Sequence, residues 1–379
     1  SGKHNNWSLT TDDGINLFKP GKKPENNSLF QLVLACTMAA VDAHAVLLRL
    51  AASNTGNDHR LGANEAPPAI ISMYLGDQVG DVVDQIIKNG EATSSLSSGE
   101  IDFGIKKLPK LEKDPTDRNR TSPFAFTGNR FEFRMVASSN TIGDVNTVLN
   151  AMMAEQFEKA VEVLSKADDF ETAVTEYTAK LMREHQRIIF NGNGYSEEWP
   201  VEAEKRGLPN CKSIVDAIPA LLDDTTIEMY GKFGILSKAE LAARKEILFE
   251  QYAGVRNIEA LTMVDMANKL IIPATVKYTK ELADTVLAVK EAGVDATIQA
   301  EMLADATAKL AEMKKAVKNL SEVTEKAANA GDAQAVAVAY KDEVMEAMAE
   351  LRKPADELEV VMPKEEWPMP TYGDLVFEL

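Results

Sequence analysis

The spacing of hydrophobic residues divides the chain into a mixed amino-terminal part and a long helical remainder. In the first part, residues 28–53 are apolar on nearly every side and predict one buried helix. Residues 76–89 predict an amphipathic helix that ends at Gly90, a residue type that commonly terminates helices. Later in the chain, apolar residues recur every three or four positions, which is the period of a helix. We therefore expect two regions, residues 1–140 and residues 141–379.

The second region predicts one helix after another, over residues 146–165, 169–189, 197–206, 213–222 and 236–253. A longer helical pattern over 258–292 contains Pro273, which predicts a kink or a break. Apolar residues spaced by three and four over 303–320 form a heptad seam, and a second apolar helix over 336–351 follows a turn. This pattern predicts an antiparallel helical hairpin. The tail 367–374, rich in proline and aromatic residues, is expected to dock on another surface.

Strand-like alternation of polar and apolar residues occurs only in the first region. Residues 1–12 predict a strand in which His4, Asn6 and Ser8 share one face. Residues 101–105 predict a second strand. The polar face of this first strand is the first group of candidate site residues along the chain.

The segment Arg-Phe-Glu-Phe-Arg is the most informative alternating pattern. It opens a predicted strand over 130–136, after a basic, proline-punctuated loop over 106–129. Arg130, Glu132 and Arg134 would share one face, with the two phenylalanines on the other. Two guanidinium groups beside a carboxylate suit the binding of a phosphate or a carboxylate next to a metal ion. An exposed edge strand with a charged outer face would have the same pattern, and this stretch alone does not decide between the two.

Composition narrows the class of protein. The 379-residue chain has a net charge of −18 and a pI near 4.8, which disfavours nonspecific binding to nucleic acid or to an anionic membrane. Its two cysteines, Cys36 and Cys211, indicate neither a disulfide framework nor a zinc site. The longest apolar run, 29–50, is interrupted by polar residues, so we expect no membrane span and a cytoplasmic location. Because the chain starts with Ser-Gly-Lys and has no initiator methionine, we expect processing or a fragment.

Polar clusters at four places in the first region could together form a site for ATP and a metal. Gly2 permits close backbone approach beside His4, a possible metal ligand. A glycine-bearing loop carries Arg60 and Glu65, which suit an anion clamp and a lid. Arg120 lies beside hydroxyl residues, which suits phosphate, and the charged strand is the fourth cluster. Taken alone, His4 also fits a structural histidine, the Arg60–Glu65 loop a polar surface loop, and the segment around Arg120 a solvated basic turn.

The wording of these clusters resembles, in the same order, the successive active-site motifs of glutamine synthetase: Ser1-Gly-Lys-His4, Arg60-Leu-Gly-Ala-Asn-Glu65-Ala-Pro67, Asn119-Arg120-Thr-Ser and Arg130-Phe-Glu132-Phe-Arg134. Two further phrases resemble the long type III enzymes: Phe190-Asn-Gly-Asn-Gly-Tyr195-Ser and the terminal Pro-Thr-Tyr-Gly-Asp374. The resemblance covers essentially the whole chain. It implies an α+β fold: part of a catalytic domain with a curved antiparallel sheet and flanking helices, followed by a mostly helical carboxyl-terminal region.

The resemblance implies a two-step reaction in which ATP phosphorylates the γ-carboxylate of glutamate and ammonia then displaces the phosphate to give glutamine. Mg²⁺ or Mn²⁺ would neutralise the phosphates. His4 and Glu132 resemble ligands of one of these metal ions. Gly2, Arg60 and Arg134 resemble positions that contact the substrate glutamate.

The remaining site residues are also implied by the resemblance. Glu65 resembles the glutamate of a flap that closes the site and helps deprotonate ammonium, and Arg120 resembles the arginine that stabilises the transferring phosphoryl group. Asn6, Ser8 and Arg130 match positions near ATP. Asn6 stands where the common type I pattern has a histidine.

The family's β-grasp domain and early catalytic region have no counterpart in this sequence. We therefore expect a carboxyl-terminal portion that is inactive in isolation. The resemblance also implies self-association into a stacked-ring homo-oligomer, with no nucleic-acid or membrane partner. Two alternatives are open: a related ATP-dependent enzyme, such as a guanidino kinase or a γ-glutamyl ligase for another amine, and a non-catalytic truncated homologue that acts as an assembly module.

Overall fold

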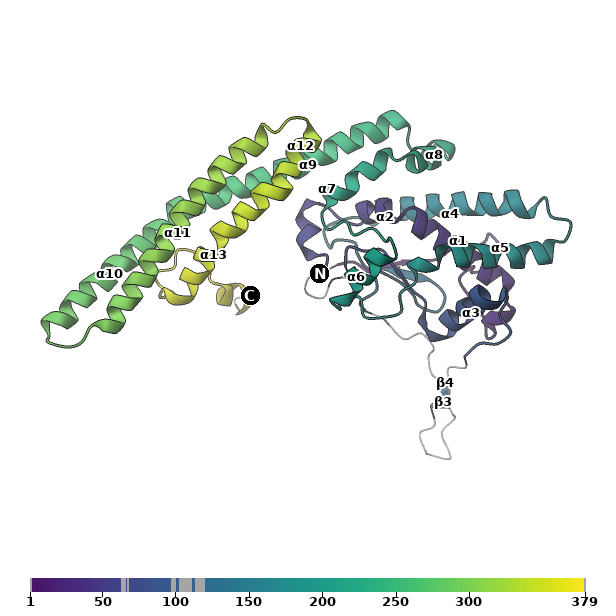
Figure 1. Cartoon of the computed structure of the whole chain (residues 1–379), viewed down its shortest axis with the longest axis horizontal. Helices are drawn as coiled ribbons and strands as arrows, with labels where there is room; N and C mark the ends of the chain where they lie inside the picture. Colours follow the sequence, from purple (N-terminus) through teal and green to yellow (C-terminus); the bar gives the residue numbers. More distant parts are fainter. Residues whose placement is uncertain are drawn as a thin grey trace. The chain divides into compact units, whose positions relative to one another are not determined.

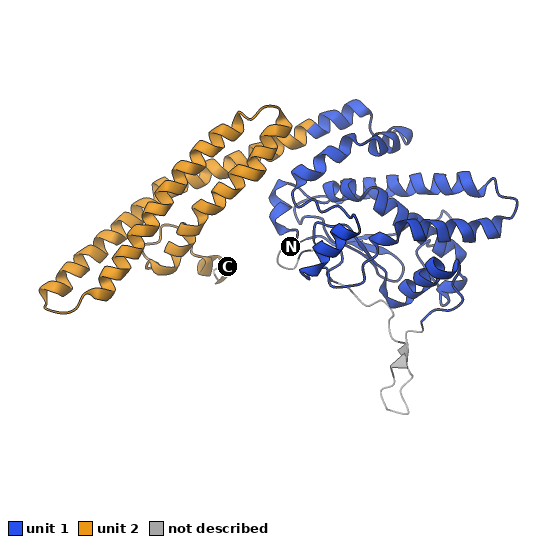
Figure 2. Ribbon diagram, in the orientation of Figure 1, with its two compact units in different colours: residues 1–245 blue, residues 246–379 orange. Residues whose placement is uncertain are grey.

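The computed structural model describes residues 2–62, 66, 68–96, 100–101, 111–112 and 120–377 (Figure 1). These residues form two compact units, 1–245 and 246–379 (Figure 2). The predicted division between residues 140 and 141 separates a catalytic-domain portion from a helical carboxyl-terminal region, and it stays a prediction.

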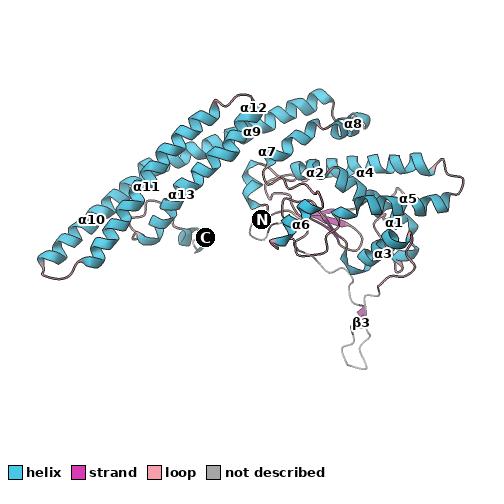
Figure 3. Ribbon diagram, viewed as in Figure 1, coloured by secondary structure: helices cyan, strands magenta, loops and turns pink. Residues whose placement is uncertain are grey.

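The first unit combines a small sheet with helices (Figure 3). Its strands are β1 (Asn5–Trp7), β2 (Met73–Tyr74), β3 (Glu100–Ile101), β4 (Leu111–Glu112), β5 (Phe124–Phe126) and β6 (Phe131–Phe133). Its helices are α1 (Ser28–Ala43), α2 (Ala45–Ala51), α3 (Gly76–Asn89), α4 (Gly143–Leu164), α5 (Phe170–His185), α6 (Glu198–Lys205), α7 (Ile214–Ala217) and α8 (Asp224–Lys232). Short 3-10 turns occur at Pro24–Asn26, Thr55–Arg60 (η2), Gln186–Ile188 and Ile218–Leu222. The predicted α+β fold class is confirmed.

The main sheet has the strand order β1-β6-β5-β2. β6 pairs antiparallel with both β1 and β5, whereas β2 runs parallel to β5. β5 lies inside the segment that we expected to be loop, and this prediction is wrong. Three residues after a proline carry too little periodicity to be recognised locally, and β5 exists because β6 and β2 pair with it on either side.

An aromatic layer backs the sheet. Phe124 stacks on Phe131, with ring centroids 4.6 Å apart and planes inclined by 15°. Phe133 meets the edge of Phe124, and Phe30 of α1 packs against Phe126. All five rings are buried, so the apolar face of β5 and β6 is anchored in the core, as the alternating pattern predicted for β6.

One long helix over 28–53 was expected, and the structure instead breaks it at His44. The axes of α1 and α2 differ by 77°. The His44 side chain is buried, and its Nε2 lies 3.0 Å from Oε2 of Glu155 on α4, which holds the corner in place. This pair of bent helices could cross a membrane by length and composition alone, and within the described residues no single helix could. Most of α1 is buried against α4 and α5, as expected of a core helix.

Helix ends in the first unit follow local rules. α3 spans the predicted residues 76–89 and ends at Gly90, whose φ is +94°. α5 begins after Asp169, whose side chain accepts a hydrogen bond from the Thr172 backbone N–H. Sequence reasoning located these ends because the capping chemistry is contained within a few residues.

The second unit is helical, and Figure 1 shows its long helices side by side. Its elements are α9 (Lys238–Met266), which begins in the first unit, a π-helical turn (Ala267–Ile271), α10 (Ile272–Glu291), α11 (Thr297–Ala328), α12 (Ala333–Ala339), a second π-helical turn (Tyr340–Val344), α13 (Met345–Val361) and α14 (Tyr372–Phe377). The predicted hairpin is present as α11 and α12–α13, and α10 packs on α11 as a third helix. The tail folds back on α13, where the Tyr372 backbone N–H donates to Oε1 of Glu359 at 2.7 Å.

One helix boundary in this unit differs from expectation. α9 continues through residues 253–258, where two separate helices were predicted. The buried Arg256 pairs with Glu259 at 2.6 Å and lies over the Tyr252 ring, so contacts along the helix stabilise the continuous form. At Pro273, where a kink or a break was predicted, α-helical hydrogen bonding is interrupted: a π-helical turn precedes the proline and provides the extra residue that accommodates it.

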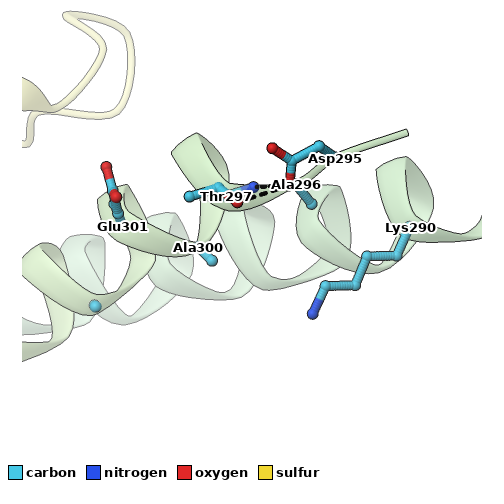
Figure 4. Close-up of a pocket in the computed structure, with 7 residues that line it drawn as sticks. Lys290, Asp295, Ala296, Thr297, Ala300 and Glu301 are labelled. Atoms are coloured by element: carbon cyan, nitrogen blue, oxygen red, sulfur yellow. Dashed lines mark hydrogen bonds between the residues drawn. The ribbon is translucent and has the colours of Figure 1, made fainter. Parts of the chain in front are cut away.

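An open hollow of about 370 Å³ lies at the turn between α10 and α11 (Figure 4). Asp295 accepts hydrogen bonds there from the backbone N–H and the hydroxyl of Thr297, at 3.2 and 2.7 Å. Lys290 and Glu301 also line it. The Asp295–Thr297 hydrogen bonds complete the start of α11, so this carboxylate serves the helix end.

Candidate active site

The polar faces of β1 and β6 lie next to each other on one side of the sheet. The register places Asn6 opposite Glu132, so strand alternation puts His4 and Arg134 on the same face as this pair. β6 lies between β1 and β5, and Glu132 and Arg134 are only 5% and 4% exposed. The alternative of an exposed edge strand is therefore wrong.

Glu132 is the centre of this face. Its Oε1 lies 2.7 Å from Nδ1 of His4, and its Oε2 accepts hydrogen bonds from Nη2 and Nε of Arg134 at 2.6 and 3.1 Å. Burial alone would raise the pKa of Glu132, but the hydrogen bonds and charge of Arg134, together with His4, hold it below its usual value. The carboxylate is therefore kept ionised, with one oxygen facing an imidazole and the other an arginine.

Arg134 is positioned by the segment that precedes β5. Its backbone N–H donates to the carbonyl of Pro123 at 2.9 Å, and its Nη1 lies 3.5 Å from the carbonyl of Ser122. Ser122 is itself buried. The predicted Asn-Arg-Thr-Ser cluster and the charged strand therefore meet in space.

Arg60 reaches the same strands from η2. A Cβ atom at residue 2 would overlap the Arg60 guanidinium, so only glycine allows this arginine to lie against the start of the chain. Nη1 of Arg60 lies 3.4 Å from the carbonyl of Met135, immediately after Arg134. Burial lowers the pKa of Arg60, and its interaction with Tyr195 opposes that change. The structure thus brings Gly2, Arg60 and Arg134 to one place.

A buried ion pair fixes η2 and therefore the start of the Arg60 side chain. Nη2 of Arg49 lies 3.4 Å from Oδ1 of Asp58, two residues before Arg60. Asp58 also accepts a hydrogen bond from the Ser213 hydroxyl at 2.8 Å, and the Ile214 backbone N–H lies 2.8 Å from its Oδ2. Sequence reasoning gave Asp58 no role, because its partners Ser213 and Ile214 lie about 155 residues away and no local pattern marks them.

The residues expected near ATP are less enclosed. Asn6, Ser8 and Arg130 are exposed. The Ser8 hydroxyl lies 3.1 Å from the carbonyl of Asn129, which joins the end of β1 to the turn before β6. The three positions lie along the same pair of strands as Glu132, and their predicted role with ATP stays a prediction.

Arg120 is exposed at the edge of the described region, and its neighbour Thr121 contacts a distant loop. The Gly194 backbone N–H donates to the Thr121 hydroxyl at 2.7 Å. Sequence analysis noted Gly194 only as part of a family phrase and assigned it no role. The predicted flap residue Glu65 lies outside the described residues, as do Ser1 and Asn119.

The residues that face each other could supply two ligands to a divalent metal ion, His4 and Glu132. A hard cation such as Mg²⁺ takes about six ligands, mostly oxygens. In the part of the chain that the structure describes, no group of three or more histidine, cysteine, aspartate or glutamate side chains is arranged to hold a metal. The described residues therefore do not form a complete metal site by themselves.

Comparison with known proteins agrees with the motifs. The family model for the glutamine synthetase C-terminal domain matches residues 173–290. A glutamine synthetase of Butyrivibrio fibrisolvens is 40% identical over 390 residues, covering 100% of this chain and 54% of the relative. By sequence, the chain is a relative of the glutamine synthetases.

Two further glutamine synthetases extend the comparison. The type-3 enzyme of Dictyostelium discoideum is 38% identical over 386 residues, covering 100% of this chain and 52% of the relative. A glutamine synthetase of Bacteroides fragilis is 36% identical over 391 residues, covering 100% of this chain and 53% of the relative. The chain spans about half the length of the curated glutamine synthetases that it matches. The predicted resemblance to the glutamine synthetases, one of them named a type-3 enzyme, is confirmed.

Proposed function

We propose that this chain supplies the carboxyl-terminal part of a glutamine synthetase active site, which joins ammonia to L-glutamate through a γ-glutamyl phosphate at the expense of ATP. One observation carries the proposal: His4, Glu132 and Arg134 form a hydrogen-bonded row beside Arg60 and Gly2. These residues belong to three separate motifs. A structural role for each motif in isolation would not require them to meet.

The electrostatics of the row suit a small dicarboxylic substrate. The Arg134 guanidinium is buried and that of Arg60 is partly buried, and a guanidinium withdrawn from solvent binds a carboxylate more strongly than one in water. In this proposal Arg60 and Gly2 contact the substrate glutamate, and Arg134 contacts its carboxylate or the phosphate that it receives. Glu132 keeps Arg134 oriented, since Nε and Nη2 of Arg134 both donate to one oxygen of this carboxylate.

Phosphoryl transfer requires positive charge where negative charge develops. We assign this part to Arg120, with Arg130, Ser8 and Asn6 toward ATP, and with Glu65 as the residue of a lid that excludes water. Mg²⁺ or Mn²⁺ enters the proposal only as an ion that His4 and Glu132 could help to hold. Its remaining ligands would have to come from outside the described residues.

Self-association into rings, which rests on the resemblance, and the cytoplasmic location expected from the sequence are part of the same proposal. The alternatives are an enzyme that uses another amine or phosphate acceptor, and an assembly module without activity. The Arg60 and Arg134 pair favours a carboxylate substrate over a guanidino substrate, because a guanidinium would be repelled by it.

The test is ATP-dependent glutamine formation by the native protein that carries these residues, with Glu132→Gln and Arg134→Met compared with the surface variant Glu162→Gln. Glu162 is 72% exposed on α4 and pairs only with Lys166 in the described structure, so it provides a matched carboxylate control. We expect both site variants to lose at least about 100-fold in turnover, and the control to keep wild-type activity.

Assays with methylamine and with creatine in place of ammonia and glutamate separate the competing enzymes. Product formation with ammonia and glutamate, and none with methylamine or creatine, supports the proposal. A preference for methylamine or creatine contradicts it. A native protein that forms no product with any of these substrates would favour the assembly module. The 379-residue chain alone is expected to form no glutamine.

A further inference from the structure

The loop of residues 189–196 is built onto the edge of the main sheet. Ile189 forms a parallel bridge with Met73 of β2, and the Phe190 backbone N–H donates to the Met73 carbonyl at 2.9 Å. The Leu75 backbone N–H donates to Oδ1 of Asn191 at 3.1 Å. The loop therefore starts from a fixed position on β2, the strand at the opposite edge of the sheet from β1.

Aromatic and cationic side chains stiffen the base of this loop. Phe190 stacks on Trp199 of α6, with ring centroids 3.7 Å apart and planes inclined by 14°. The Arg206 guanidinium lies 5.8 and 5.6 Å from the centroids of the two rings, and its Nη1 donates to the Ile189 carbonyl at 2.7 Å. A Cβ atom at Gly192 would lie 2.6 Å from the Phe190 ring. The base is packed too closely to move without disturbing α6.

The tip of the loop lies directly against the backbone beside Arg120. The Gly194 N–H donates to the Thr121 hydroxyl at 2.7 Å, and a Cβ atom at residue 194 would lie 2.6 Å from the Thr121 carbonyl oxygen. No side chain other than hydrogen fits between the two backbones. Oδ1 of Asn193 accepts a hydrogen bond from the Tyr195 N–H at 3.0 Å, which closes the turn at the tip.

We propose that residues 189–196 are a positioning loop that holds the Arg120–Thr121 segment in place from the far edge of the sheet, through the contact of Gly194 with Thr121. Arg120 itself has an exposed side chain, so its backbone has to be fixed by its neighbours if its guanidinium is to meet a substrate at a defined place. The charge interaction of Tyr195, next to Gly194, opposes the lowering of the Arg60 pKa by burial, so the same loop also acts electrostatically on the second predicted anion-binding arginine. The consequence for catalysis rests on the proposed function, whereas the contact itself does not.

Amide hydrogen exchange of the 379-residue chain tests the contact directly. Thr121→Val removes the hydroxyl acceptor with little change in shape, and Thr121→Ser keeps it. We expect Thr121→Val to raise the exchange rate of the Gly194 amide at least about fivefold, as for the loss of one hydrogen bond, and Thr121→Ser to restore protection. Equal protection of Gly194 in the wild type and in Thr121→Val would overturn the proposal.

Steady-state kinetics of the native protein test what the contact does. Because Arg120 is assigned to the transferring phosphoryl group, its displacement should lower kcat about tenfold and leave KM for glutamate within about twofold. We expect this pattern for Thr121→Val and for Gly194→Ala, with recovery in Thr121→Ser. Gly231→Ala on α8 is the matched control, since nothing lies within 4 Å of a Cβ atom there.

The two measurements fail in different ways. Loss of Gly194 protection without any change in kcat would refute a positioning role for the loop, and wild-type kinetics in Gly194→Ala would do the same. A native protein without synthetase activity would refute the proposed function, and the exchange result would still decide whether the loop holds the Arg120–Thr121 segment.

Discussion

The buried pair of Arg49 and Asp58 connects the stability of the first unit to the position of Arg60. Arg49 is 1% exposed and Asp58 is 9% exposed. Burial lowers the pKa of Arg49 and raises that of Asp58, although Ile214, Ser213 and Arg49 oppose the change at Asp58. Each charged form is therefore costly without its partner, and Asp58→Asn leaves a buried guanidinium that lacks its counter-ion.

We expect Asp58→Asn to lower the free energy of unfolding by about 3 kcal/mol, the lower end of the range for removing one member of a buried pair. The lower end applies because Arg49 keeps other acceptors: the carbonyls of Cys211 and Lys212 at 2.7 and 3.2 Å, and the Ser53 hydroxyl. The double variant Arg49→Met with Asp58→Asn should cost less than the sum of the two single variants, because it leaves no unpaired charge.

Urea unfolding followed by circular dichroism measures these differences, and amide exchange at Ile214 measures the same loss locally. Glu162→Gln removes a pair whose members are 70% and 72% exposed and should change the unfolding free energy by less than about 0.5 kcal/mol. If Asp58→Asn were as mild as this control, or if the double variant cost the full sum, the pair would not be holding η2 in the way described.

Three further predictions concern separate parts of the first unit. Burial alone would raise the pKa of Glu155, but the hydrogen bonds and charges of His44 and Lys159 lower it to about 2. The stabilisation that the Glu155 carboxylate provides should therefore be complete above about pH 4.5 and vanish as the pH falls through about 2. Urea unfolding of Glu155→Gln and of the wild type across this pH range measures the difference. Gly2→Ala should raise KM for glutamate at least about tenfold by displacing the Arg60 guanidinium. Phe124→Ala should lower the unfolding free energy by about 3–5 kcal/mol, because a fully buried, stacked ring is removed from the core.

Each of these predictions has a matched control. Glu158→Gln replaces a carboxylate that is 47% exposed on α4, and loss of its surface ion pair with Lys232 should change the unfolding free energy by less than about 1 kcal/mol. Gly231→Ala adds a methyl group where there is open space. Phe170→Ala removes a ring that is 61% exposed and should be nearly neutral. A control that behaves like its partner variant would contradict the corresponding prediction.

Local patterns in the sequence determined much of the helical architecture, and they marked most of the residues that we propose for the candidate site. The end of α3 at Gly90, the apolar seam of α11 and the turn at Asp332 all follow from residues within a few positions of each other. The alternation of Arg130, Glu132 and Arg134 likewise required only the period of a strand. The four motifs carried the resemblance to the glutamine synthetases for the same reason, since each consists of a few consecutive residues.

Only the tertiary structure decided which of these elements meet. His4 and Glu132 are 128 residues apart, and no local pattern specifies that β1 pairs with β6 in the register that joins them. The bend at His44 depends on Glu155, and the place of Arg120 depends on Gly194, again across long stretches of chain. Helix periods and caps are properties of neighbouring residues, whereas strand register, buried charge pairs and backbone contacts depend on partners that folding brings together. The sequence therefore predicted many of the candidate site residues, and the tertiary structure decided which of them lie in contact.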